Sequence, residues 1–351
     1  MRVLVAMSGG VDSSVCAARL VAQGHDVVGV HMKLHDADAG GRPGKCCGLD
    51  DAADAAAVAD RLGIPFYVHD LRQAFAEAVQ QPFLAAWIGG RTPSPCIACN
   101  GVLKFRVLLQ RALALGCSHL ATGHYARIDG ERLLTARDPA KDQTYFLFPL
   151  TPRAVSRTLF PLGDLTKAEV REEARRFGLD TADKAESQDI CFLPNGDHGA
   201  WVSQQRPDLD GSGAFVLQDG TVVGEHDGYH RFTVGQRKGL GVALGVPAFV
   251  VRIEPDTRRV VLGTDADLHH TGLDASGANW LAEPEPGERV EVRVRHRGER
   301  IGAWIERDGD RLQARFDGHL RAVTPGQAAV FYRGDQVLGG AWIERAHRGL
   351  G

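Results

Sequence analysis

The chain has 351 residues, of which 44% are hydrophobic, and this composition predicts a globular protein with two or three domains. Its formal net charge of −3 excludes a general attraction to nucleic acid, so any RNA contact must come from local basic patches. No signal peptide precedes the first apolar segment and no apolar run is long enough to span a bilayer, so we expect a cytoplasmic protein without a membrane partner. In a reducing compartment, its seven cysteines are expected to be catalytic, metal-binding or buried rather than paired in disulfides.

The first 23 residues predict a strand, a glycine turn and a helix. Residues 2–6 form a short apolar run, residues 8–10 break it, and residues 11–23 have apolar side chains at helical spacing. This order collects backbone N–H groups and the positive end of a helix at the carboxyl edge of a strand, which suits an anion. Glycine lets a phosphate approach the backbone, and the Asp12 carboxylate can hold a phosphate-bound magnesium ion or accept from a loop N–H.

Two common phosphate-binding loops are excluded at this place. The sequence has neither Gly-x4-Gly-Lys-Ser/Thr nor Gly-x-Gly-x-x-Gly opening the helix. Residues 8–14 (SGGVDSS) instead resemble the pyrophosphate loop, or PP-loop, of the ATP pyrophosphatases, which split ATP between its α- and β-phosphates and adenylate a substrate oxygen. The alternative is an ordinary glycine turn between a strand and a helix.

The next hundred residues alternate between strand and helix patterns. Strands are predicted at residues 26–32, 64–68 and 119–122, helices at 50–62, 73–87 and 104–115, and a polar loop at 36–48. Such alternation indicates a parallel, doubly wound sheet, whose ligands bind beyond the carboxyl ends of the strands. The loops at Ser8, near Met32 and near Gly123 should therefore meet at one nucleotide.

The second half of the chain changes character. Residues 166–169 (TKAE) form a capping box, and the helix that they begin should end at Gly178. From about Gly211 onward, short apolar alternations are broken by Asp-Gly, Pro-Gly and Gly-Gly pairs. This pattern predicts antiparallel β structure, with a barrel near the C-terminus.

A pair of cysteines follows a helix-start signal. Ser94 suits an N-cap and Pro95 the first helical position, so Cys96 and Cys99 would lie in the first turn, where helix N–H groups lower the pKa of a thiol. A reactive or cluster-binding pair, a zinc site and two inert thiols are the alternatives, although Cys46 and Cys47 make a poor second pair for zinc. Cys191 alone would suggest a buried thiol, but beside this pair and the PP-loop it is a candidate second sulfur centre.

Taken together, the motifs of this sequence resemble those of the tRNA-specific 2-thiouridylases. The matching stretches run through nearly the whole chain in the order of that family: MSGGVDSS at 7–14, Cys99-Asn100 with Lys104-Phe105, ATGHYA at 121–126, KDQTYFL at 141–147, ESQDICF at 186–192, FTVGQRKGLG at 232–241 and residues 330–340. No single stretch decides the resemblance, but together they leave little room for chance.

The resemblance implies a fold and an activity. It implies a PP-loop catalytic domain at 1–195, of which about 150–185 packs as a helical tRNA-binding part, a central β-rich adaptor at 196–268 and a tRNA-binding β-barrel at 269–351. The implied activity is that of a tRNA-uridine 2-sulfurtransferase. ATP with Mg²⁺ adenylates O2 of the wobble uridine of Lys-, Glu- and Gln-type tRNAs and releases pyrophosphate, and sulfur from a cysteine desulfurase or relay protein then replaces AMP at C2.

The resemblance also implies roles for single residues. Cys191 would carry sulfur as a persulfide, and Cys99 would be the nucleophile that releases it, through a transient disulfide with Cys191. The implied ATP-binding residues are Ala6, Met7, Ser8, Gly9, Gly10, Val11, Asp12, Ser13, Met32 and Gly123. The implied RNA-binding residues are Ser94, Pro95 and Cys96 at the target base, Lys141, Asp142 and Gln143, and Arg295 with His296. Strand alternation places Glu291, Arg293, Arg295 and Arg297 on one face, which suits phosphates or is simply solvated.

One departure from the family leaves the sulfur chemistry open. Many members have aspartate where this chain has Cys96. Cys96, Cys99 and Cys191 could therefore hold three irons of a [4Fe–4S] cluster, as an alternative to the persulfide route. The rival functions are a PP-loop synthetase of the argininosuccinate-synthetase type, which needs no such thiols, and a non-catalytic RNA-binding or redox module, which needs no ATP turnover.

Overall fold

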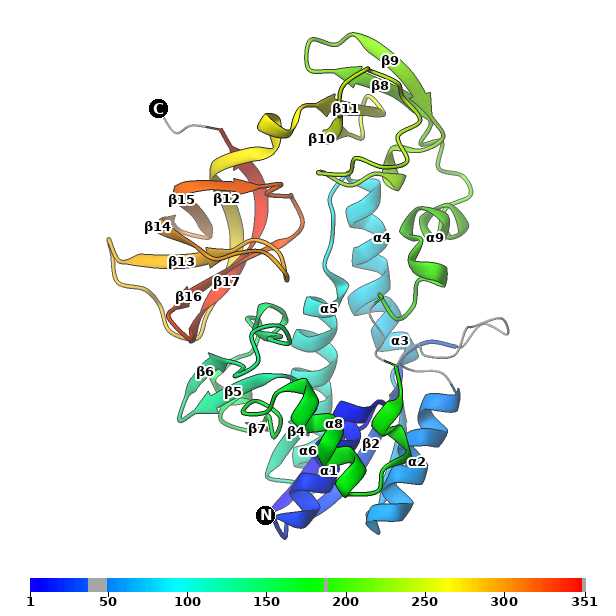
Figure 1. Cartoon of the computed structure of the whole chain (residues 1–351), viewed down its shortest axis with the longest axis vertical. Coiled ribbons are helices and arrows are strands. Elements are labelled where there is room, and N and C mark those ends of the chain that lie inside the picture. The colour runs from blue at the N-terminus through cyan, green and yellow to red at the C-terminus, as the bar shows by residue number, and fades with distance from the viewer. Residues whose placement is uncertain (37–48, 186–188, 349–351) are drawn as a thin grey trace.

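The computed structural model describes residues 1–36, 49–185 and 189–348. Figure 1 shows an α/β unit that contains the N-terminus, a smaller sheet at the far end of helix α4 (Gln81–Ile88), and a β-barrel beside both. None of the helices among the described residues is long and apolar enough to cross a bilayer.

A five-stranded parallel sheet forms the N-terminal unit. Its order is β3-β2-β1-β4-β7, and all of its neighbouring strands are parallel. The strands are β1 (Arg2–Ala6), β2 (Asp26–Lys33), β3 (Phe66–Asp70), β4 (His119–Thr122) and β7 (Thr158–Leu159). The predicted doubly wound sheet is confirmed, although β3 begins two residues later than expected. Since the strand order reverses between β1 and β4, the carboxyl ends of these two strands mark the place where such sheets bind ligands.

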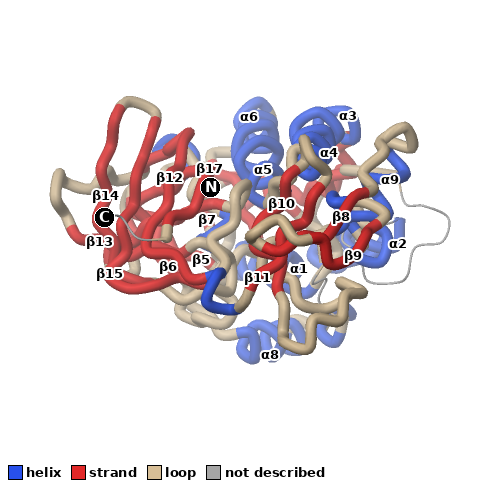
Figure 2. The backbone as a smooth tube through the Cα atoms, turned by 90° about the horizontal axis from the view of Figure 1, so that it is seen from above, coloured by secondary structure: helices blue, strands red, loops and turns tan. Residues whose placement is uncertain are grey.

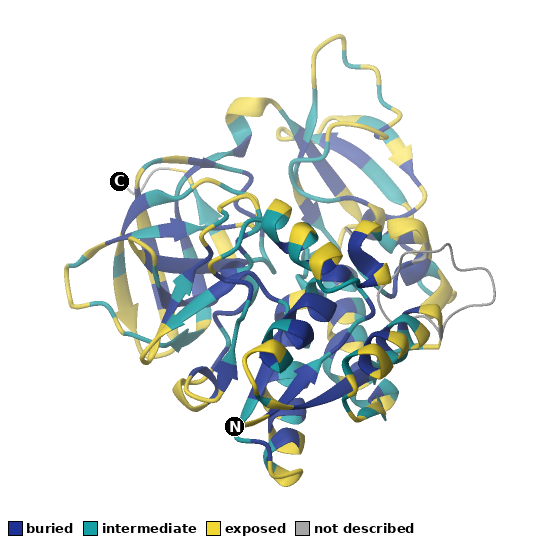
Figure 3. Ribbon diagram, turned by 60° about the horizontal axis from the view of Figure 1, so that its bottom comes forward, coloured by how far each residue is buried: buried dark blue, intermediate teal, exposed yellow. Residues whose placement is uncertain are grey.

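Helices cover both faces of this sheet. Alternate residues of β1 separate the two layers: Leu4 packs with α6 (Leu109–Ala114), whereas Val3 and Val5 pack with α1 (Val11–Ala22), α2 (Leu49–Leu62) and α8 (Lys167–Arg176). In Figure 3 the inner strands of the sheet are mostly buried, and exposed residues lie on the outer helix faces and on loops. The edge strand β3 is also partly exposed, at Tyr67 and Val68. The other helical segments are α3 (Arg72–Phe75), η1 (Ala76–Gln80), η3 (Thr144–Phe146), α7 (Pro152–Val155), η4 (Asp180–Asp183), η5 (Pro194–Gly196), α9 (His198–Gln205), η6 (Tyr229–Arg231) and η7 (Asp265–Leu268).

The helix that carries the cysteine pair is longer than the sequence predicted. It begins at Pro95 and continues without a break through α5 (Pro95–Ala98), the π-helical η2 (Cys99–Leu108) and α6. The expected second start near residue 104 does not occur. Gly101 does not end the helix but lets it approach the 144–150 segment, because a Cβ at this glycine would lie 3.0 Å from Cβ of Pro149.

The central sheet has four strands in the order β10-β11-β8-β9. They are β8 (Gly213–Leu217), β9 (Val222–His226), β10 (Phe249–Glu254) and β11 (Arg259–Gly263). The expectation of purely antiparallel structure is wrong here, since β8 and β11 pair in parallel. Apolar alternation reports which face of a strand is buried but not which strand lies next to it.

Six strands close into an antiparallel barrel in the order β12-β15-β14-β13-β16-β17, with β17 pairing back to β12, and this confirms the predicted barrel. They are β12 (His269–Trp280), β13 (Arg289–Arg293), β14 (Ile301–Asp308), β15 (Arg311–Arg321), β16 (Ala328–Arg333) and β17 (Gln336–His347). Figure 2 shows these strands gathered beside the helices of the N-terminal unit. Alternate strand residues such as Val290, Val292 and Leu338 fill the interior.

The barrel is attached to the N-terminal unit by hydrogen bonds and by a shared core. The hairpin of β5 (Ala126–Asp129) and β6 (Arg132–Thr135) continues the barrel sheet, since Leu134 pairs with Gln336 of β17. The hydroxyl of buried Tyr145 donates to the Ala328 carbonyl at 3.0 Å, and both residues belong to one apolar cluster that also includes Leu4 of β1. The boundaries at 195/196 and 268/269 stay predictions.

Candidate active site

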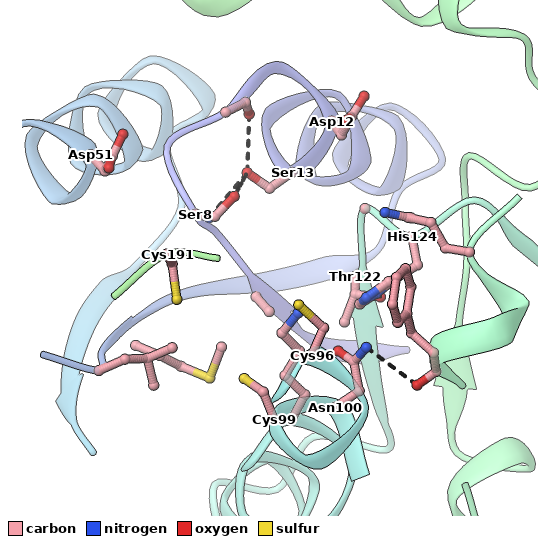
Figure 4. Close-up of a pocket in the computed structure, with 18 of the residues that line it drawn as sticks. Ser8, Asp12, Ser13, Asp51, Cys96, Cys99, Asn100, Thr122, His124 and Cys191 are labelled. Atoms are coloured by element: carbon pink, nitrogen blue, oxygen red, sulfur yellow. Dashed lines mark hydrogen bonds between the residues drawn. The ribbon is translucent and has the colours of Figure 1, made fainter. Parts of the chain in front are cut away.

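The loop after β1 is folded back onto the first turn of α1. The Ser8 N–H donates to Oγ of Ser13 at 3.1 Å, and the Ser13 hydroxyl donates to the Gly10 carbonyl at 3.0 Å (Figure 4). The Ser14 hydroxyl donates to the same carbonyl at 2.9 Å. These bonds fix the turn so that its backbone and the start of α1 face the carboxyl edge of the sheet, as an anion-binding loop requires.

Two glycines let other segments approach this loop closely. Gly9 has φ +75°, and a Cβ there would overlap the carbonyl oxygen of Asp51 in α2. Gly123, after β4, has no room for a Cβ either, because the carbonyl carbon of Asp12 would lie 2.8 Å from it. Both positions therefore require glycine for space, and at Gly9 the backbone angle requires it too.

The Asp12 carboxylate and the Gly9 carbonyl of the loop have hydrogen-bond partners that the sequence did not predict. The Asp12 carboxylate accepts from Nζ of Lys167 at 2.7 Å and from the hydroxyl of Tyr125 at 2.8 Å. Nζ of Lys184 donates to the Gly9 carbonyl at 3.0 Å and to the Asp51 carboxylate at 2.7 Å. Tyr125 stands in the quoted ATGHYA stretch and Lys167 in the capping box, but neither pattern indicates the partner.

A buried histidine also supports the loop. His31 of β2 is 2% exposed, and its Nδ1 lies 3.0 Å from the carbonyl oxygen of Met7. Because a carbonyl only accepts, Nδ1 must carry the hydrogen. Burial lowers the pKa of His31, so the ring holds the loop in its neutral form.

A cavity of about 400 Å³ opens at the ends of β1, β2 and β4. It brings together most of the predicted ATP-binding residues with the three predicted sulfur residues. From the predicted sets it is lined by Ala6, Met7, Ser8, Gly10, Val11, Asp12, Ser13, Met32, Gly123, Pro95, Cys96, Cys99, Lys141, Gln143 and Cys191. The loops after the three strands thus meet at one cavity, as the topology predicted, while the role of each residue stays a prediction.

The three thiols enter the cavity from two segments. Cys96 and Cys99 lie on the helix that begins at Pro95, and Cys191 faces them from the segment after residue 188 (Figure 4). Cys96 is exposed, whereas Cys99 and Cys191 are half-buried against an apolar cluster that includes Phe192. Residues 186–188, which begin the quoted ESQDICF stretch, lie outside the described residues.

The expected lowering of a thiol pKa by the helix start is wrong for Cys99. Burial raises the pKa of this thiol, and the positive charge of Lys104 only partly opposes the effect. Cys99 follows the four residues of α5 and packs into the apolar cluster, so desolvation outweighs the N–H groups at the helix start. Only the burial of the side chain, which sequence does not report, decides this sign.

The three thiols of the cavity are not placed as the ligands of an iron–sulfur cluster. Among the residues that the structure describes, no three His, Cys, Asp or Glu side chains are placed to hold a metal. Cys96, Cys99 and Cys191 share the cavity without forming such a set. Cys46 and Cys47 lie outside the described residues.

Two further polar residues lie in the cavity wall. Asn100, which is 3% exposed, donates to the Phe146 carbonyl at 3.4 Å, and its Oδ1 has no hydrogen-bond partner among the described residues. His124 shares a hydrogen bond of 2.7 Å with Thr122, and burial lowers its pKa strongly. Sequence alone gave neither side chain a role.

The remaining predicted RNA-binding residues lie apart from the cavity lining. Ser94 is the N-cap of α5, although its side chain makes no capping bond. Asp142 is buried and bonded to Arg293 at 3.0 Å. Arg295 is exposed, and the His296 ring lies 4.4 Å from that of Phe146. The alternation predicted through residue 297 is wrong beyond β13, which ends at Arg293, so Arg295 and Arg297 lie past the strand.

The parallel sheet, the loop after its first strand and the cavity at the strand ends define a PP-loop nucleotide-binding protein of the α/β class. Family models match three parts of the chain: the tRNA methyl transferase HUP domain at residues 1–195, the tRNA methyl transferase PRC-barrel domain at 202–264 and the aminomethyltransferase beta-barrel domain at 270–343.

Curated relatives match over nearly the whole length. A protein of Solibacter usitatus is 48% identical over 366 residues, covering 97% of this chain and 99% of the relative. A protein of Carboxydothermus hydrogenoformans is 48% identical over 356 residues, covering 98% of both. Both relatives are named tRNA-specific 2-thiouridylase MnmA. This chain therefore belongs to the tRNA-specific 2-thiouridylase family.

Proposed function

We propose that this protein is a tRNA-uridine 2-sulfurtransferase that uses ATP to thiolate the wobble uridine of tRNA. The observation that carries the proposal is a single cavity in which the PP-loop faces Cys96, Cys99 and Cys191. A phosphate loop supplies activation of an oxygen, and thiols supply the group that replaces it. The family model is described as a methyl transferase, but the names of the relatives and the thiols favour sulfur transfer.

The first step uses the loop side of the cavity. ATP enters with its magnesium ion as substrate, with its β- and γ-phosphates toward residues 8–13 and its adenine near the backbone of Met32 and Gly123. The uridine O2 attacks the α-phosphorus, and the bond to the bridging oxygen breaks so that pyrophosphate leaves. Backbone N–H groups and the start of α1 stabilise the charge that develops on the leaving pyrophosphate.

The second step uses the thiol side. A cysteine desulfurase or relay protein supplies sulfur, which Cys191 carries as a persulfide. The terminal sulfur attacks C2 of the uridine, and AMP leaves with the electrons of the C2–O2 bond. The Cys99 thiolate then attacks Sγ of Cys191 and breaks the S–S bond. Sulfur stays on C2, and the resulting Cys99–Cys191 disulfide is reduced by an external thiol. Because burial raises the pKa of Cys99, its thiol must give its proton to solvent before the thiolate attacks.

RNA would reach the cavity from the side of the barrel. Exposed Cys96, next to Ser94 and Pro95, would meet the target base, and Lys141 lies in the cavity wall. Arg295 and His296 follow the end of β13 and would contact the phosphates of tRNAs of the Lys, Glu and Gln type, in the cytoplasm. No step runs through a metal cluster, because the donors do not fit one.

Reconstitution tests this function. Purified protein is incubated with ATP, unmodified tRNA and a cysteine desulfurase with cysteine, and the nucleosides are analysed by mass. We expect 2-thiouridine at the wobble position with wild type and none with Cys191→Ser. Pyrophosphate release that needs no tRNA and responds to an amino acid would instead support a synthetase of the argininosuccinate type. Absence of 2-thiouridine from the complete wild-type reaction would overturn the proposal.

A further inference from the structure

The buried carboxylate of Asp142 is hydrogen-bonded to three other residues of the protein. Its side chain is 3% exposed, and its carboxylate accepts from Nη1 of Arg293 at 3.0 Å. It also accepts from the Thr144 hydroxyl at 2.9 Å and from the Ala136 N–H at 3.2 Å. A buried carboxylate with these donors has no face left for an RNA phosphate, which would also be repelled by its charge.

The next residue connects Asp142 to the PP-loop. The backbone N–H of Gln143 donates to the Tyr125 carbonyl at 3.0 Å, and the side-chain Oε1 of Gln143 accepts from the Tyr125 N–H at 2.9 Å. The hydroxyl of Tyr125 in turn donates to Asp12 at 2.8 Å. A continuous chain of bonds therefore runs from Arg293 through Asp142, Gln143 and Tyr125 to the phosphate loop.

We propose that Asp142 is a positioning residue that ties the C-terminal barrel to the phosphate loop, so that RNA held at the barrel and ATP held at the loop share one fixed geometry. The inference rests on the proposed function for its RNA and ATP. Asp142 does not touch either substrate; it acts through Gln143 and Tyr125 on one side and through Arg293 on the other.

The physical basis is the cost of separating a buried ion pair. The side chains of Asp142 and Arg293 are only 3% and 14% exposed, so moving the barrel would leave a charge in a poorly hydrated place. The exposed Arg295 follows Arg293 by two residues, and the His296 ring packs on Phe146, four residues after Asp142. The proposed RNA-contacting turn and the cavity wall are therefore fixed in position relative to each other.

The test compares Asp142→Asn, Arg293→Gln and the double variant. Each single variant should lower kcat of thiolation about tenfold, as expected for one charge-assisted hydrogen bond, and the double variant should lose no more than the worse single one. The Kd of ATP, measured without tRNA, should rise, while the Kd of tRNA should change less than about twofold. Arg289→Gln is the matched control, because it removes an exposed ion pair with Asp317 from the same strand and should leave kcat and both Kd values unchanged.

Opposite patterns would overturn the inference. If Asp142→Asn raises the Kd of tRNA and leaves kcat unchanged, Asp142 contacts RNA directly; if the two single effects add, the residues do not act together. Tyr125→Phe covers the case in which the barrel variants do not fold, because it breaks the chain of bonds at Asp12 and leaves the Asp142–Arg293 pair intact. This variant should weaken ATP binding, and unchanged ATP binding would contradict the link. Because ATP binding is measured without tRNA, this result stands apart from failure of the thiolation assay.

Discussion

The two sides of the cavity are built in different ways. The loop side is one stretch of chain, residues 7–13, whose polar groups bond to one another or to fixed partners such as Lys167. The thiol side is assembled from residues 96–99 and residue 191, and its cysteines range from exposed to half-buried. The groups proposed for activation thus come from one stretch of chain that distant residues hold in place, while the thiols proposed for sulfur transfer come from separate segments. Variants should therefore separate the two chemistries.

The largest expected effect is a loss of thiolation while pyrophosphate release continues. Cys99→Ser or Cys191→Ser should lower thiolation about 1000-fold or more, because a hydroxyl can neither carry nor release the sulfur. Pyrophosphate release that depends on tRNA should continue, because the loop is untouched. Both rates are measured in one reaction, with wild type as the reference. Loss of pyrophosphate release together with thiolation would show that the two sides do not work separately.

The next effect tests the close packing of the loop. Gly9→Ala should lower the free energy of unfolding by about 2–4 kcal/mol and weaken ATP binding, since the new Cβ meets Asp51 at positive φ. Gly24→Ala also has positive φ, +78°, but nothing lies within 4 Å of the added Cβ. It should cost only about 1 kcal/mol and leave ATP binding unchanged. Urea unfolding and ATP titration measure both, and equal costs would contradict the packing explanation.

A smaller effect concerns the partner of Asp12. Lys167→Met should raise the Kd of ATP about tenfold, because it leaves the Asp12 carboxylate facing the phosphates without its cation. Arg175→Met removes a charge from the same helix, but the Arg175–Asp183 pair is exposed, and we expect no change in that Kd. Calorimetric titration distinguishes the two variants; similar losses would indicate a general effect of charge.

The smallest effect is a pH dependence of the loop side. Burial holds the pKa of His31 below its ordinary value of 6.5, so the unfolded chain binds a proton that the folded protein excludes. The stability from this group is present above pH 6.5 and is lost as the pH falls toward the lower pKa of the folded state. His31→Gln has an amide that can still donate to Met7, and its free energy of unfolding should fall less than that of wild type between pH 7 and pH 5. Equal slopes in urea unfolding would exclude this contribution.

The sequence predicted those features that depend on neighbouring residues. The strand, glycine turn and helix at the N-terminus occur where expected, with β1 at Arg2–Ala6 and α1 from Val11. The capping box at Thr166 and Glu169 has both of its hydrogen bonds. In each case hydrophobic spacing and a local cap fix the structure within one or two turns of chain.

Features that depend on distant partners could not be predicted. Tyr125 reaches Asp12 across 113 residues, and Arg293 reaches Asp142 across 151. A separate helix was expected from residue 104, but one helix runs on from Pro95, and the approach of Pro149 to Gly101 was not visible in the local pattern. The prediction of a lowered pKa for Cys99 failed for the same reason. The direction of this pKa shift is set by residues that pack around the thiol from other segments.

The bond between Tyr145 and Ala328 has a consequence for how the protein is made. The two residues lie 183 positions apart, so the N-terminal sheet leaves the ribosome long before the barrel strands that complete the apolar core around Tyr145. Until then Tyr145, Phe148 and Leu150, all buried in the finished protein, lack part of their cover. Synthesis of the barrel therefore sets the moment at which this shared apolar core is closed, so the N-terminal unit packs fully only after the last strands have been made.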